Sequence, residues 1–508
     1  MLSRVVLSNV RTGQATSAVS VLSRFKATMS STQTDDGVSN AKPFSALPGP
    51  KGLPFIGTVF DVMKNSSRMH EMIQKRHETY GPIYREKMGA VNAVFLTDVE
   101  SVEQLFRQDA KHPRRIDIEH WIQYREERGL NKGLVMSSGE DWHSLRRVID
   151  RHMMKIKTVE SYTGEFNNVV VEFLDRVGGI RTSDNELPAL NLELFNWSLE
   201  SIARILYEKR LGCLSDERSE DTQVFIQSSH DIFETTRKII FLPPKAARIL
   251  RPFSYRKHIS AWDEGFRVAH KTIDERIMEI RETKEEGKHV GFITHFLQED
   301  SMSLKDVYAN ISELMGAAVD TTSNTAQMVL YELSRNPHVQ DAILEEITRV
   351  VPPGEQPTAD HLKEMHYIKA VIKETLRLYP TGSVVIRILQ QDAVLLGYQV
   401  PKNTMVWVDL YGFGRLGRHY EDPNTFRPER WLRATRTVSP HPFSFLPFGF
   451  GPRMCVGRRV AELEIQLLIS QIVRKFKIEP VSMEPVEMKT DLLLLAKDPI
   501  RIRLHERD

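Results

Sequence analysis

Cysteine is nearly absent from this sequence, and so is any excess of charge of one sign. The 508 residues include two cysteines, Cys213 and Cys455, which lie far apart in the chain. That count excludes a disulfide scaffold and a zinc site built from cysteines. The formal net charge is +2, so no global basic excess exists to neutralise phosphates, and we expect no nucleic-acid partner. Hydrophobic content of 41% and charged content of 27% are those of an ordinary globular protein.

Acidic residues and long apolar runs are both missing from the N-terminal segment. No Asp or Glu precedes Asp35, and no apolar run in residues 1–34 exceeds three residues. A transmembrane helix needs about 20 apolar residues, and a secretory signal needs an apolar middle. A basic, serine-rich and acid-free segment is typical of a mitochondrial transit peptide. We therefore expect a transit peptide and disordered lead over residues 1–40, with an ordinary disordered tail as the alternative.

The rest of the sequence indicates a helix-dominated domain. Prolines and glycines in 47–58 forbid a helix and mark the start of the folded body. The alternation over 83–98 predicts a β-hairpin, and the stretch from about 99 to 350 is mostly helical in pattern. After residue 380 the pieces are shorter and β-rich. The predicted fold class is mainly α with small β-sheets (α+β), in a single domain over 41–508.

A glycine-rich loop surrounds the second cysteine. Residues 448–464 read FGFGPRMCVGRRVAELE, and helical apolar spacing begins just after Gly457. A cysteine at a helix N-terminus, beside Arg453 and the pair Arg458 and Arg459, should ionise easily. A rigidly held anionic sulfur with no second cysteine nearby suits a single axial bond to a metal held elsewhere, as in haem. The alternative is an inert buried cysteine in a glycine-rich turn.

The spacing of this loop resembles a known signature. Phe448, Gly451, Arg453, Cys455 and Gly457 form F-x-x-G-x-R-x-C-x-G, which resembles the haem-thiolate motif of the cytochrome P-450 monooxygenases. The resemblance implies that family's fold. It also implies a haem b whose iron is bound by the cysteine, lying between an oxygen-binding helix and the cysteine loop with the helix that follows. The reaction implied is insertion of one oxygen atom of O2 into a lipophilic substrate.

Polar residues interrupt an apolar helical stretch at 311–331. Asp320 and Thr321 stand in ISELMGAAVDTTSNTAQMVLY, where burying them is costly unless their polar groups are used. A threonine inside a helix can bond back to a carbonyl one turn earlier. The stretch resembles the oxygen-binding helix of the family, in which an acid and a threonine relay protons; Ala318 replaces the usual glycine. The alternative is a capped surface helix with one polar face.

Three charged residues resemble the family's Glu-x-x-Arg pair and its partner. Glu374 and Arg377 lie three apart on one helical face in KETLRLYP, where they can pair. Arg430 follows in PERW. The resemblance implies a buried network behind the haem that acts as scaffold. By itself, the Glu374–Arg377 pattern is also that of a common surface ion pair.

Haem carries two propionates, which require cations. Trp142 and Arg146 are spaced i and i+4 in GEDWHSLRR and resemble the family's W-x-x-x-R. Arg387 and Arg453 complete the expected set, because the planar guanidinium can bind two carboxylate oxygens. Phe448 is expected beside the cofactor. For Arg387 alone, a solvated strand residue is the alternative.

The chain has no flavin- or nucleotide-binding module to supply electrons. Lys369 and Lys373 lie one turn apart, and Arg458 and Arg459 follow the cysteine. Together they predict a cationic patch, and ordinary surface charges are the alternative. The pattern resembles mitochondrial members of the family, which receive electrons from an acidic two-iron ferredoxin of the adrenodoxin type with its reductase.

Two further features bear on location and substrate. The stretch 237–253 is basic and amphipathic around two prolines, which indicates either peripheral membrane association or a solvated helix connection. The segments AAVDTT, HWIQYREERG and NPHVQDAILEEI resemble mitochondrial steroid and vitamin D hydroxylases, the 24-hydroxylase branch or an invertebrate relative. The expected place is the matrix side of the mitochondrial inner membrane. Alternatives are action on xenobiotics or fatty acids, a donor-independent isomerase, and a haem sensor.

Overall fold

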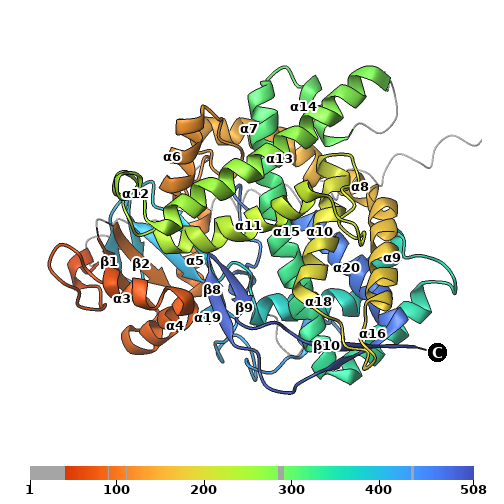
Figure 1. Ribbon diagram of the computed structural model, residues 1–508. Coiled ribbons are helices and arrows are strands. Elements are labelled where there is room, and N and C mark those ends of the chain that lie inside the picture. The colour runs from red at the N-terminus through yellow and green to blue at the C-terminus, as the bar shows by residue number, and fades with distance from the viewer. Residues whose placement is uncertain (1–40, 90, 110, 284–290, 436–439, 508) are drawn as a thin grey trace, which may run out of the picture.

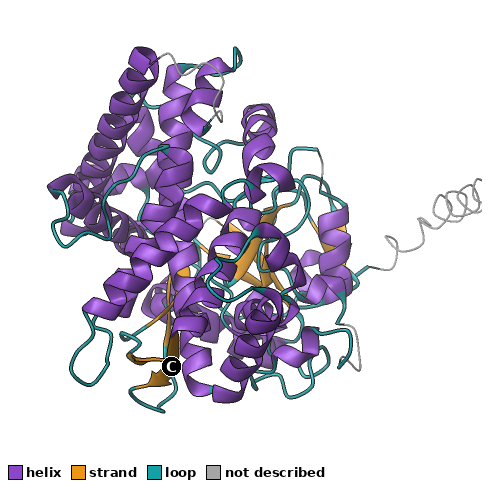
Figure 2. Cartoon of the chain, turned by 90° about the vertical axis from the view of Figure 1, so that its right-hand side faces the viewer, coloured by secondary structure: helices purple, strands orange, loops and turns teal. Residues whose placement is uncertain are grey.

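The computed structural model describes residues 41–89, 91–109, 111–283, 291–435 and 440–507. The expected transit peptide and lead over 1–40 lie outside the described residues. Figure 2 shows that helices make up most of the chain and that the strands form a few small groups. The prediction of a mainly helical fold with small sheets is confirmed.

The helices pack around one long central helix, α15 (Leu304–Arg335), which crosses the middle of the molecule in Figure 1. It begins with a capping box, in which Ser303 and Asp306 exchange hydrogen bonds between side chain and backbone, and Pro337 lies just beyond its end. The α-helices packed around it are α10 (Leu190–Leu206), α13 (Phe253–Thr283), α14 (Phe292–Gln298), α16 (Pro337–Val350), α18 (His366–Leu378) and α20 (Arg458–Lys475). Its 32 residues therefore form the axis on which the site is built.

The remaining helices cover this centre. The α-helices are α3 (Val59–Lys64), α4 (Met69–Tyr80), α5 (Val99–Arg107), α6 (Glu119–Arg128), α7 (Gly139–Met153), α8 (Ile156–Glu160), α9 (Thr163–Gly179), α11 (Glu220–Ile239), α12 (Pro244–Leu250), α17 (Ala359–Glu364) and α19 (Leu410–Phe413). Short 3-10 turns lie at Phe44–Ala46, Ser66–Arg68, Pro428–Trp431 and Pro442–Ser444. Among the described residues, no helix is long and apolar enough to span a membrane.

The largest sheet has four strands in the order β1-β2-β6-β3. The predicted hairpin over 83–98 is present, because β1 (Ile83–Met88) and β2 (Val91–Leu96) pair antiparallel with Ile83 opposite Leu96. Strand β6 (Met405–Asp409) pairs parallel with β2 and antiparallel with β3 (Val384–Ile388). Three two-stranded sheets complete the fold: β4 (Ala393–Leu395) with β5 (Tyr398–Val400), β7 (Phe476–Pro480) with β10 (Ile502–Glu506), and β8 (Met488–Asp491) with β9 (Leu493–Ala496).

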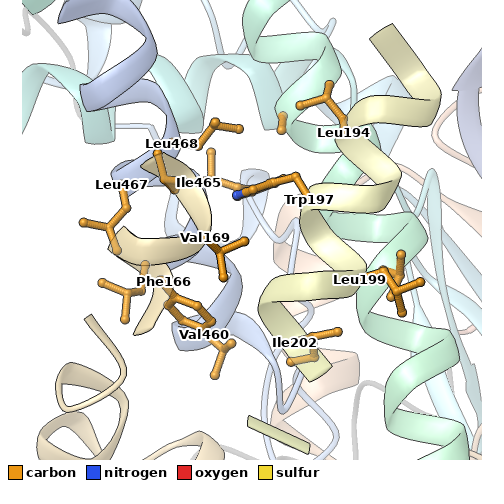
Figure 3. Packing of buried hydrophobic residues seen from close by; sticks show 14 of the residues in the cluster. Phe166, Val169, Leu194, Trp197, Leu199, Ile202, Val460, Ile465, Leu467 and Leu468 are labelled. Carbon is orange, nitrogen blue, oxygen red and sulfur yellow. The ribbon is translucent and has the colours of Figure 1, made fainter. Parts of the chain in front are cut away.

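The main hydrophobic core lies among α9, α10, α15 and α20. Figure 3 shows Trp197 of α10 directed toward Ile465 and Leu468 of α20, with Phe166 of α9 near Val460 of the same helix α20. These side chains are at most 2% exposed. The core thus fixes α20, and with it the loop that carries Cys455, against the central helix.

Candidate active site

The loop before α20 has a tightly defined backbone. Gly449 and Gly451 have φ of 70° and 73°, in the left-handed region that favours glycine. The Cys455 amide donates to the carbonyl of Phe448 at 2.8 Å, and the Met454 amide donates to that of Gly451 at 3.0 Å. The sulfur is therefore presented three residues before α20 begins at Arg458.

The predicted easy ionisation of Cys455 is wrong for the protein on its own. The side chain is accessible but lies deep inside the protein, and this burial raises the pKa of its thiol. The backbone amides of Gly457 and Arg458, with Arg146 and Arg115, lower the pKa by less. Desolvation therefore outweighs the effects of the helix N-terminus and of the nearby arginines on this thiol.

The predicted carboxylate-binding residues lie close to the loop. The Arg453 guanidinium stands over the ring of buried Trp142, 4.1 Å from its centroid, and donates from Nη2 to the carbonyl of Ser137 at 2.9 Å. Arg146 donates from Nη1 to the carbonyl of Met454 at 2.7 Å. The backbone beside Cys455 thus orients Arg146, whereas the backbone of Ser137 orients Arg453.

Arg387 joins this group, and the alternative of a solvated strand residue does not apply to it. It is 2% exposed, and its Nε lies 2.9 Å from Asp109 Oδ2. Its Nη2 donates to the carbonyl of Phe450 at 3.2 Å. Strand β3 therefore contributes a buried cation to the site.

No motif in the sequence pointed to Arg115, which is the fourth arginine of the cluster. Burial, followed by the charges of Arg387 and Arg146, lowers the pKa of Arg115 to about 10. The pKa of Arg453 falls to about 9, through burial and then through Arg115 and Arg387. The arginines lower one another's pKa because their positive charges repel. A bound anion would reduce this repulsion. Asp109 and Asp150 pair with Arg387 and Arg146 and offset only part of it.

On α15 the back-bonded threonine is present. Thr321 Oγ1 donates to the carbonyl of Ala317 at 2.9 Å, while the helix remains continuous. A Cβ added at Gly316 would meet no atom within 4 Å, and Ala317 is exposed. This stretch of the helix therefore has open space beside it.

The Asp320 side chain is 13% exposed, and its carboxylate is only partly satisfied by hydrogen bonds. Burial raises the pKa of its carboxyl to about 7. Among the described residues, its Oδ2 has no hydrogen-bond partner. Its Oδ1 lies 3.9 Å from Nδ1 of His230 on α11, a half-exposed residue that sequence reasoning missed. Asp320 can thus hold or release a proton near neutral pH.

The three-charge network is present and buried. The Glu374 carboxylate accepts from Arg377 Nη2 at 2.7 Å, from Arg430 Nε at 2.9 Å and from Trp431 Nε1 at 2.9 Å. The amide of Arg427 also donates to it, at 2.9 Å. The network joins α18 to the turn Pro428–Trp431, so the alternative of a surface ion pair does not apply.

The predicted cationic patch lies where α18 and α20 pack together. Lys369 and Arg459 line one cleft of about 170 Å³, which also includes Glu462. Lys373 is exposed, with its Nζ 5.9 Å from the centre of the Trp431 ring. Arg458 pairs with Glu462 at 3.0 Å, which offsets part of its charge.

Residues 47–504 match the family model described as Cytochrome P450. The chain is a cytochrome P450. It is 35% identical over 446 residues to the mitochondrial 1,25-dihydroxyvitamin D(3) 24-hydroxylase of Rattus norvegicus, covering 87% of this P450 and 86% of that protein. It is 35% identical over 496 residues to the mitochondrial sterol 26-hydroxylase of Mus musculus, covering 94% and 92%. It is 34% identical over 484 residues to the mitochondrial 25-hydroxyvitamin D-1 alpha hydroxylase of Homo sapiens, covering 92% and 94%.

A cytochrome P450 is a haem monooxygenase whose iron takes a cysteine thiolate, and the residues of this site fit that group. Cys455 is the accessible cysteine of the chain, whereas Cys213 is buried. The arginine cluster supplies more positive charge than its own acids balance, as a porphyrin with two carboxylates requires. When bound, haem supplies the activation of O2, and a thiolate ligand favours cleavage of the O–O bond.

Proposed function

We propose that this P450 is a mitochondrial hydroxylase of a sterol, steroid or secosteroid that takes its electrons from a two-iron ferredoxin. The observation that carries the proposal is the set of relatives. Three proteins at 34–35% identity, each covered over at least 86% of its length, are all named as mitochondrial hydroxylases of vitamin D compounds or sterols. The acid-free, basic composition of residues 1–34 supports a mitochondrial address.

In this proposal Cys455 is the thiolate ligand, and the arginines at 115, 146, 387 and 453 hold the propionates. Trp142 supports Arg453 through its ring. Removing any one arginine would weaken charge-assisted bonds to the carboxylates, because a buried guanidinium and carboxylate interact strongly. The loop 446–455 then keeps the sulfur in one place relative to these cations.

Asp320 and Thr321 are proposed to deliver protons. Burial holds the pKa of Asp320 at about 7, so its carboxyl can give up a proton and recover it at working pH. Thr321 Oγ1 lies on the open face of α15 and can accept and pass on that proton. These roles disfavour a donor-independent isomerase, which would have no use for a proton-delivering pair.

The patch of Lys369, Lys373, Arg458 and Arg459 is the proposed docking surface for the ferredoxin. An acidic partner would be steered by opposite charge, and encounter would weaken as salt increases. The Glu374 network adjoins this surface, because Trp431 donates to the Glu374 carboxylate and its ring also lies under Lys373 Nζ. Its proposed role is scaffold.

Peripheral membrane association is proposed at two exposed apolar groups. Ile249, Leu250 and Phe253 are 78%, 70% and 73% exposed where α12 ends and α13 begins, and Phe55, before α3, is 89% exposed. Figure 1 places α3 and α12 on the left side of the molecule. Large apolar side chains next to cations suit the interface of an anionic membrane, the matrix side of the inner membrane in this proposal. A lipophilic substrate could then enter from the bilayer.

One set of measurements tests the function. Reduced protein with carbon monoxide should show the red-shifted thiolate band, and Cys455→Ser should abolish it. Turnover of a panel containing 1,25-dihydroxyvitamin D3, cholesterol, lauric acid and a xenobiotic should occur with the first two and require added ferredoxin and reductase. Turnover of lauric acid or the xenobiotic alone would overturn the substrate class. Rearrangement without any donor would instead identify an isomerase.

A further inference from the structure

A buried glutamate on α15 holds a loop that lies above the active site. Glu313 stands just over two turns before Thr321 on the same helix, and its side-chain direction differs from that of Thr321 by about 80°. Its Oε1 accepts from the amide of Gly133 at 3.0 Å, and its Oε2 accepts from the amides of Val135 at 2.8 Å and Met136 at 3.3 Å. A Cβ added at Gly133 would lie 2.8 Å from this carboxylate. The loop therefore lies directly against the helix.

Arg125 of α6 gives this carboxylate its counter-charge. Its Nη2 lies 3.1 Å from Glu313 Oε1, and the two side chains are 0% and 3% exposed. The guanidinium also stands over the rings of Trp262 and Phe266 on α13, at 4.7 and 5.4 Å from their centroids. The ion pair thus joins α6 to α15, and the ring contacts of Arg125 join both to α13.

Two more acceptors extend the contact along the same helix. Asn310 Oδ1 accepts from the amide of Leu134 at 2.9 Å, and Asp306 Oδ1 accepts from the side chain of Asn131 at 2.7 Å. With Glu313, these side chains recur at helical spacing and bind successive parts of residues 131–136, so the loop has a single register on α15.

The opposite edge of the loop meets the arginine cluster and α11. Arg115 Nη2 donates to the carbonyl of Val135 at 3.3 Å, and Arg453 Nη2 donates to that of Ser137. The side chains of Val135 and Met136 pack in one apolar cluster with Ile232 of α11 and neighbours that include Leu492 of the β8–β9 turn. The loop is therefore packed against α11, α13 and the β8–β9 turn as well as against α15.

We propose that Glu313 is a positioning residue for substrate selection. By fixing the amides of 133–136, it sets where Val135 and Met136 stand relative to a lipophilic substrate. The effect on substrate rests on the proposed sterol or secosteroid hydroxylase function, whereas the positioning itself is a property of the fold.

The test compares two glutamates of the same helix in haem-loaded enzyme. Glu313→Gln removes one acceptor oxygen and the negative charge; Glu332→Gln makes the same change where the partners are Tyr379 and Asn336 instead. Amide hydrogen exchange over 133–136 should quicken about tenfold in Glu313→Gln, as loss of a net hydrogen bond predicts, and stay at the wild-type rate in Glu332→Gln. The spectral Kd for 1,25-dihydroxyvitamin D3 should weaken by a similar factor, whereas that for the small iron ligand 4-phenylimidazole should not change.

A second variant keeps the test decisive if the first variant folds poorly. Arg125→Met with Glu313→Gln removes both charges, so no buried ion is left unpaired. It should load haem normally yet keep the fast loop exchange and the weak secosteroid binding. Wild-type exchange at 133–136 in both variants, or equal changes in Glu332→Gln, would overturn the proposal. If wild-type enzyme binds no secosteroid or sterol, the proposed function fails, while the exchange rates still decide whether Glu313 positions the loop.

Discussion

Removing the carboxylate of Glu374 should separate the protein from its haem. Glu374→Ala leaves the buried guanidiniums of Arg377 and Arg430, and the indole of Trp431, without their common acceptor. Arg377 keeps bonds to the carbonyls of Gly414 and Thr425, which cannot neutralise its charge. Breaking a buried ion pair by removing one member costs about 3–5 kcal/mol. Typical domain stability is about 5–15 kcal/mol, so this variant loses a large fraction of it.

The assay is the ratio of haem to protein absorbance after purification, with the urea midpoint of the same preparation. We expect the ratio in Glu374→Ala to fall to a small fraction of that of the wild type and the midpoint to fall with it. Glu374→Gln, which keeps one acceptor oxygen, should lie between them. Glu364→Ala removes an exposed glutamate from neighbouring α17 and serves as the matched control. A fully haem-loaded Glu374→Ala protein with an unchanged midpoint would refute the scaffold role.

Three further predictions follow from the site and its surface. Burial raises the pKa of Asp320 to about 7 from 3.8, so between those pH values the folded state binds a proton that the unfolded state has released. This residue's contribution to stability therefore falls as pH rises through that window, by up to about 4 kcal/mol, and Asp320→Asn should remove that part of the slope in urea unfolding measured at a series of pH values. Reversing charge at Lys369 and Lys373 should raise the apparent KM for ferredoxin several-fold and flatten its dependence on salt; unchanged kinetics would dismiss the patch. Replacing Leu250 and Phe253 by serine should reduce co-sedimentation with anionic vesicles, while the carbon monoxide spectrum remains normal; undiminished sedimentation would place the contact elsewhere.

The spacing of residues in the sequence was enough to find those site residues that lie together in one loop or one helix. The loop around Cys455, the pair Asp320 and Thr321, and the ion pair of Glu374 with Arg377 were all predicted, because each is written within one loop or one helix. Their contacts agree with that reading: Thr321 bonds back to a carbonyl, and the Glu374 carboxylate pairs as expected. The roles of these residues remain predictions.

Residues that act across the fold could not be found in this way. Arg115 and His230 have no motif around them, and Glu313 lies within the quoted stretch 311–331 but received no role there; the partners of all three lie far away in the chain. The ionisation of Cys455 was misjudged for a related reason. Nearby arginines and the helix N-terminus are visible in the sequence, but the depth at which the thiol is buried is not, and desolvation outweighs them.

The unbroken course of α15 restricts how the length of this chain can change. Its 32 residues span about 48 Å, and the loop-binding face at 306–313 and the pair at 320–321 share that one rod. Inserting a single residue between Glu313 and Asp320 would turn one set by about 100° relative to the other and separate them by about 1.5 Å. Insertions and deletions are therefore better tolerated in the surface loops than between Glu313 and Asp320.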